Sequence, residues 1–259
     1  MQKQYIKADV ILSLGSACRT AHHLRKNHLR LFSSPLDWMV SGDLDIIYDL
    51  FCNDFKDFFL NYEVVKHSKK GDKADEPIHV KDVKYDILSI HHFFANEDLK
   101  IQSKRVNEQS IYRWNKIKQK LLLAKNIVFI HCGNFELEKI KKFLTKTSLL
   151  LKRNGGGNNI KYYFINISSN ENLNENEIYI DEFKFNENLH IINYTINDSY
   201  NGFIGNASAW KKILKSLKMP LKIKIKNAIN DFFIRLKRSC KRRIAFFTKK
   251  YKNDINEFH

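Results

Sequence analysis

The sequence predicts an α/β fold, with an α+β arrangement as the alternative, because short apolar runs alternate with segments of helical spacing along most of the chain. Hydrophobic residues make up 43% of the 259 residues, which is enough for a substantial core. Buried strands are predicted at 10–14, 126–130, 161–167 and 189–194. Helices are predicted at 17–26, 43–59, 102–124, 135–152 and 208–218.

The remaining segments follow in order from their composition. Residues 30–39 mix polar and aromatic side chains around Pro35, which predicts a loop or a short extended piece. Residues 66–84 are polar and contain Gly71 and Pro77, so a surface excursion is expected there. Alternation over 85–90 predicts a strand that ends at His91 and His92.

The formal net charge of +17 is concentrated near the C-terminus. Thirteen Lys or Arg residues and one acid lie between 218 and 252, among apolar residues spaced three or four apart. This pattern predicts a basic amphipathic helix, and the chain is expected to divide into a catalytic domain, 1–217, and a tail, 218–259. An anionic membrane surface is the expected partner of the tail, and packing on the domain is the alternative. Its membrane-facing cations would be Arg235, Lys237, Arg238, Lys241, Arg242 and Arg243.

Several classes of protein are disfavoured. The chain has no apolar run long enough to span a bilayer and no recognisable signal peptide, so we expect a cytoplasmic protein, peripheral on the inner membrane if the tail binds lipid. No nucleic-acid recognition motif accompanies the basic charge, so no nucleic-acid partner is expected. The four cysteines are widely spaced and predict free thiols, and no His or Cys spacing matches a metal site.

Cys18 is the candidate nucleophile. It follows an apolar strand and the turn at Gly15 and Ser16, and a helical pattern begins beside it. Unpaired backbone N–H groups at a helix start favour negative charge, so the thiol is expected to be more acidic than a free cysteine. The same N–H groups, with the turn at Gly15 and Ser16, could stabilise an oxyanion.

A nucleophilic thiol needs a base and usually a group that orients the base. His91, at the end of its predicted strand, is the better placed base, and His22 is a weaker alternative on the helix of Cys18. Asp37 is a lone carboxylate among apolar neighbours and could orient the histidine or cap its own turn.

These residues together resemble a known bacterial family. The segments LSLGSAC at 12–18, LRLFSSPLDW at 29–38 and YDILSIH at 85–91 are similar to motifs of a family of papain-like cysteine peptidases. The resemblance covers about residues 8–215 and implies a layered papain-like domain. It implies Cys18 as nucleophile, His91 as base and Asp37 as the orienting acid. The sequence departs from the family's motifs at His92 and at His131. The first departure leaves open whether His91 or His92 is the base, and at the second position such proteins often carry an arginine. The candidates for substrate binding are His92, His131 and Trp38.

The resemblance implies a thiol hydrolase with a Cys–His–Asp triad, acting on a peptide or glycan without a cofactor. A looser similarity to Cys–His proteins of surface-polysaccharide biosynthesis implies the alternative of an O-acyltransferase, for which acetyl-CoA is the expected donor. A third hypothesis is a non-catalytic, membrane-associated assembly protein in which the tail is the functional element and Cys18 belongs to the core.

Overall fold

The structure, a computed structural model, describes residues 5–15, 18–66, 77–199, 202–229 and 232–233. The chain divides into two compact units, Met1–Met219 and Pro220–His259, and each is described by itself. Within the described residues, no helix combines the length and the apolar character needed to span a bilayer.

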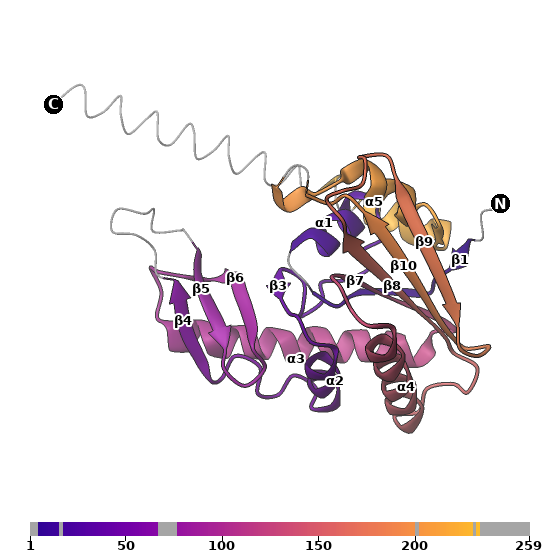
Figure 1. The fold of residues 1–259 in the computed structure, drawn as a ribbon. Coiled ribbons are helices and arrows are strands. Elements are labelled where there is room, and N and C mark those ends of the chain that lie inside the picture. The colour runs from indigo at the N-terminus through magenta and orange to yellow at the C-terminus, as the bar shows by residue number, and fades with distance from the viewer. Residues whose placement is uncertain (1–4, 16–17, 67–76, 200–201, 230–231, 234–259) are drawn as a thin grey trace. The chain divides into compact units, whose positions relative to one another are not determined.

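A five-stranded sheet forms the centre of the first unit (Figure 1). Its order is β2-β7-β8-β10-β9, in which the first four strands are parallel and β9 pairs antiparallel with β10 at the edge. The strands are β2 (Val10–Ser13), β7 (Asn126–Cys132), β8 (Lys161–Ser169), β10 (Leu189–Ile196) and β9 (Ile178–Lys184). Parallel strands joined through helices confirm the predicted α/β class.

Helices cover both faces of this sheet (Figure 1). On one face, α1 (Cys18–Lys26) packs on β7 and contacts α5 (Ala207–Leu214) and the short 3₁₀ helix η1 (Gly202–Ile204). On the other, α4 (Leu137–Arg153) packs on β8 and β10 and contacts α2 (Leu44–Cys52) and α3 (Leu99–Leu123). The predicted last helix stops at Leu214, because β11 (Leu217–Lys218) pairs with β1 (Ile6–Lys7).

A second, antiparallel sheet has the order β3-β6-β5-β4. Its strands are β3 (Met39–Val40), β6 (Ile87–Phe94), β5 (Pro77–Asp82) and β4 (Tyr62–Lys66). The prediction of a surface excursion at 66–84 is therefore wrong for the segment that forms β5. In this strand Ile78 and Val80 are buried, and their neighbours are polar. This alternation is the signature of a half-buried strand, and the proline at its start obscured it in the sequence.

The helix expected at 43–59 ends at Cys52 because a tight turn replaces its last part. Asp54, Phe55 and Phe59 have positive φ angles of 56°, 60° and 60°. The Asn107 side chain on α3 holds this turn, since its Nδ2 lies 3.0 Å from each of the carbonyl oxygens of Phe55, Lys56 and Phe58. One amide thus satisfies several carbonyl groups that a continued helix would have bonded internally.

We expect Asn107→Ala to lower the free energy of unfolding by about 2 kcal/mol, because buried carbonyl groups of the turn would lose their donor. Urea denaturation measures the change, and Asn158→Ala, at an exposed position, is the matched control. Equal stability of the two variants would contradict this role for Asn107.

Candidate functional site

Cys18 is the first residue of α1 and follows the turn that leaves β2. Gly15 in this turn has a φ of +91°, and a Cβ atom added there would lie 2.3 Å from Ser41 Oγ. Ser41 Oγ in turn donates a hydrogen bond of 3.0 Å to the Leu14 carbonyl. Only glycine fits this conformation and this space, so the turn before the nucleophile is fixed by close packing. Ser16, the other residue predicted for the turn, lies outside the described residues.

The structure brings the Cys18 thiol and the His91 ring together. Cys18 Sγ lies 3.0 Å from His91 Nε2, although the residues are 73 positions apart in the chain. Cys18 is 5% exposed, whereas His91 is open to solvent. His91 lies inside β6 and not at its end, because the strand continues to Phe94.

Burial sets the protonation of this pair. It raises the pKa of the Cys18 thiol above its usual 9.0, and the backbone N–H of Cys18 only partly opposes the effect. Burial and the nearby His79 lower the pKa of His91. The expectation of an acidic thiol is therefore wrong, because desolvation outweighs the helix-start N–H. At neutral pH the pair is a thiol and a neutral imidazole.

Asp37 does not supply the expected hydrogen bond to His91. Its Oδ2 accepts from Arg30 Nε and from the Ser34 backbone N–H, both at 2.9 Å. Burial raises the pKa of Asp37, and the Arg30 guanidinium opposes this shift. The carboxylate thus anchors its own turn, which is the capping alternative left open by the sequence. Among the described residues, no carboxylate is hydrogen-bonded to His91, so the pair is a dyad.

Asp37 does fix the position of the next residue, Trp38. Trp38 has a φ of 69°, a conformation that a bulky residue adopts only when its surroundings impose it. Its indole meets the His91 ring edge to face at a centroid distance of 6.1 Å, and the Arg25 guanidinium lies 5.6 Å from the centre of the indole ring. Trp38 therefore borders the site as a wall beside His91.

The remaining site candidates face elsewhere. His92 Nδ1 lies 3.1 Å from Ser89 Oγ, and burial lowers the pKa of His92 to about 4. Adjacent strand residues point to opposite faces, which explains why His91 and not His92 meets the thiol. His131 is 2% exposed at the carboxyl end of β7, and burial lowers its pKa to about 4. The six tail cations lie outside the described residues.

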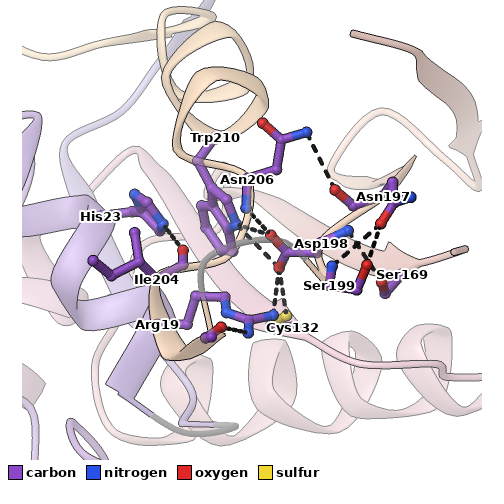
Figure 2. A network of polar contacts seen from close by, with 11 residues as sticks. Arg19, His23, Cys132, Ser169, Asn197, Asp198, Ser199, Ile204, Asn206 and Trp210 are labelled. Carbon is purple, nitrogen blue, oxygen red and sulfur yellow. Dashed lines mark hydrogen bonds and ion pairs between the residues drawn. The ribbon is translucent and has the colours of Figure 1, made fainter. Parts of the chain in front are cut away.

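A part-buried ion pair holds α1 at the residue after the nucleophile (Figure 2). Arg19 Nη1 lies 2.7 Å from Asp198 Oδ2, and the Asp198 side chain is fully buried. Asp198 Oδ1 also accepts from the Asn206 backbone N–H at 2.7 Å, and the Trp210 indole N–H donates to both carboxylate oxygens at 3.2 Å. A buried carboxylate with this many donors is satisfied, so the network ties α1 to the segment after β10.

Sequence reasoning missed this network because its members are far apart in the chain. Buried Asp198 follows β10 much as Cys18 follows β2, and its place at a strand end was the available signal. Cys132 belongs to the same network through Asp198 Oδ2 at 3.9 Å. Burial and this carboxylate raise the pKa of Cys132 to about 11, which keeps it an unreactive thiol. No group of three metal-ligating side chains occurs in the part of the chain that is described.

We expect Gly15→Ala to destabilise the protein by about 2 kcal/mol and to slow alkylation of Cys18, because the new methyl group collides with Ser41 in a left-handed backbone. Gly42→Ala is the matched control, since a Cβ atom added at Gly42 would meet nothing within 4 Å. Thermal unfolding and mass-spectrometric labelling measure both variants. Indistinguishable behaviour would show that the turn tolerates a side chain.

Comparison with known proteins gives one match. Residues 9–170 match the family described as "Putative papain-like cysteine peptidase (DUF1796)". No curated protein and no solved structure matches the chain. The matched span contains Cys18, Asp37, Trp38 and His91, whereas Asp198 and Trp210 lie beyond it. Because the match covers more than half of the chain, the protein belongs to this family of papain-like cysteine peptidases.

Proposed function

We propose that this protein is a cysteine-dependent hydrolase in which Cys18 is the nucleophile and His91 the base. The observation that carries the proposal is the distance of 3.0 Å between Cys18 Sγ and His91 Nε2. Such a distance is within reach for direct proton transfer. Family membership supports the same class of reaction.

The neutral state of the pair indicates the order of events. His91 Nε2 accepts the Cys18 proton as Sγ attacks a substrate carbonyl, which forms a C–S bond and an oxyanion. The backbone N–H of Cys18 faces its own side chain and could donate to that oxyanion. The imidazolium then gives its proton to the leaving group as the bond between that group and the carbonyl carbon breaks. Water, deprotonated by His91, attacks the thioester and restores the free thiol, so no cofactor is required.

The orienting group would be the Trp38 wall and not a carboxylate. The indole edge contact limits rotation of the exposed His91 ring, and the Asp37–Arg30 anchor holds the turn that carries Trp38. Transfer of the acyl group to a sugar hydroxyl, as in an O-acyltransferase, is the alternative fate of the thioester. Hydrolysis is preferred because family membership supports it directly.

Hydrolysis of p-nitrophenyl acetate tests the dyad. We expect His91→Gln and Cys18→Ala to reduce turnover by about 10²-fold or more with little loss of thermal stability. Cys52→Ala, at an exposed thiol, is the control. Because His91 must be neutral to accept the proton and its pKa is lowered, activity should persist below pH 6.5 and fall only at more acidic pH. Full turnover in either dyad variant would refute the mechanism, and a parent protein with no turnover above background would favour a non-catalytic assembly role.

The same neutral pair determines how Cys18 alkylation depends on pH. Since burial raises the pKa of the Cys18 thiol above 9.0, iodoacetamide labelling of Cys18 should rise steadily with pH and still be rising at pH 9. A thiolate–imidazolium pair would instead give a plateau near neutral pH. Such a plateau would contradict the protonation assigned here.

We further propose that the second unit binds an anionic membrane surface. Residues 221–229 are helical, and Leu221, Ile225 and Ile229 recur at intervals of four, which places them on one helix face. Lysines at 222, 224 and 226 supply positive charge beside that face. Such a tail would make a cytoplasmic enzyme peripheral to a membrane.

Vesicle co-sedimentation of the full chain tests this second proposal. Binding should require phosphatidylglycerol, weaken in Ile225→Asp and Ile229→Asp, and survive in Leu123→Asp, which changes an exposed leucine of the first unit. Equal binding to pure phosphatidylcholine vesicles, or no effect of the two tail substitutions, would refute it.

A further inference from the structure

A pocket of about 410 Å³ lies at the amino end of the central parallel strands. It is lined by the second half of α4, by the loop before β8, by Tyr162 near the start of β8 and by the turn at 186–188 that joins β9 to β10. Cys18 instead follows the carboxyl end of β2, and β2, β7 and β8 are parallel, so the pocket and the dyad lie at opposite ends of the sheet. The volume falls within the range of about 300–1,000 Å³ that is typical of small-molecule sites.

Tyr162 presents an unpartnered hydroxyl group to this pocket. The residue is only 4% exposed, and no hydrogen bond joins its hydroxyl to any group in the described parts of the chain. The hydroxyl is nevertheless not sealed from solvent, unlike the Oδ1 atoms of Asn166 and Asn193, so it opens on the pocket that Tyr162 lines. Burial raises the pKa of Tyr162 to about 12, so at neutral pH the group can both donate and accept. Because the hydroxyl of a buried tyrosine usually finds a partner, this one indicates a polar ligand in the pocket.

Two opposite charges line the same pocket. Lys152 lies in the last turn of α4, and Glu187 lies in the turn between β9 and β10. Lys141, Lys142 and Lys146 of α4 form ion pairs with acids, whereas neither Lys152 nor Glu187 forms one with any described residue, including each other. The pocket therefore offers a ligand one ammonium group and one carboxylate at separate places in its lining.

The other polar groups of the lining are amides and hydroxyls held by local hydrogen bonds. Asn186 Oδ1 accepts from the backbone N–H groups of Asn188 and Leu189 at 2.8 and 2.9 Å, which fixes the turn. The side-chain amide of Asn188 is partly buried and makes no hydrogen bond with another described residue. Ser148 Oγ donates to the Thr145 carbonyl at 2.8 Å and keeps its lone pairs as acceptors. A ligand would thus meet a polar surface that is largely preformed.

We propose that this pocket binds a small zwitterion of the class of free amino acids and dipeptides. Lys152 pairs with the carboxylate of the ligand, Glu187 pairs with its ammonium group, and the Tyr162 hydroxyl bonds a polar atom of its body. A ligand with one charge would leave the opposite charge of the pocket unmatched, and a neutral saccharide would leave both unmatched. The proposal concerns a second site and does not rest on the proposed hydrolysis.

Saturation-transfer NMR on the full chain carrying Cys18→Ala tests the pocket with four forms of one dipeptide. Ala-Ala carries both terminal charges, acetyl-Ala-Ala only the carboxylate, Ala-Ala-amide only the ammonium group, and acetyl-Ala-Ala-amide neither. We expect saturable binding of Ala-Ala. Its Kd should be about threefold or more below that of each other form, because every other form lacks at least one charge contact.

The Tyr162→Phe variant tests the buried hydroxyl, and Tyr163→Phe is the matched control. Tyr163 is the next residue of β8 and faces the other side of the sheet, where its ring stacks on His190. Tyr162→Phe should raise the Kd of Ala-Ala about fivefold and leave the melting temperature unchanged, because the hydroxyl has no protein partner to lose. Lys152→Gln should remove the preference for Ala-Ala over Ala-Ala-amide, and Glu187→Gln the preference over acetyl-Ala-Ala.

The proposal is overturned if Ala-Ala does not bind, if removal of its charges leaves the Kd unchanged, or if Tyr162→Phe binds it as tightly as Tyr163→Phe does. A lower melting temperature of Tyr162→Phe would assign the hydroxyl to the fold and would also overturn it. Because binding is measured without the Cys18 thiol and at the other end of the sheet, a failure of the hydrolase mechanism leaves these results readable.

Discussion

The contact between Cys18 and His91 depends on the packing of two different sheets. Cys18 begins the helix that follows the first strand of the parallel sheet, and His91 lies on a middle strand of the antiparallel sheet. A distance of 3.0 Å between their side chains therefore requires that both sheets and the turns near them be held in place. The Gly15–Ser41 contact serves this purpose on one side, and the Asp37–Arg30 anchor serves it on the other.

The site combines groups that burial shifts toward their neutral forms with an ion pair whose carboxylate is fully buried. Cys18, His91, His92 and His131 all shift toward their neutral forms because they are desolvated. Arg19, whose side chain is 22% exposed, instead pairs with the fully buried Asp198 carboxylate, which accepts additional hydrogen bonds. This division is physically consistent: an unpaired buried charge is costly, so charge is kept where several donors compensate it.

Much of the first unit could be predicted from the sequence, and the remainder could not for identifiable reasons. The parallel strands were predictable because their residues are almost continuously apolar, as in the run 127–130 of β7. The β5 and β9 strands were not, because their exposed faces dilute the apolar signal. Cys18 and His91 could be paired by resemblance, and the turn-capping role of Asp37 was one of two alternatives open in the sequence, since its partners Arg30 and Ser34 lie only seven and three residues away. The acidity of the thiol was misjudged because a helix start is visible in sequence and desolvation is not.

Asp198 lies beyond residue 170, where the match to the family ends, yet it anchors the residue next to the nucleophile. The segment that identifies the protein is therefore smaller than the segment that must fold for its site to exist. A chain cut at the family boundary would keep both members of the dyad but lose β10, α5 and the counter-ion of Arg19. A related chain that shares only the matched motifs must hold α1 by other contacts. If it has an acid equivalent to Asp198, the place to look for that acid is the segment after its last parallel strand.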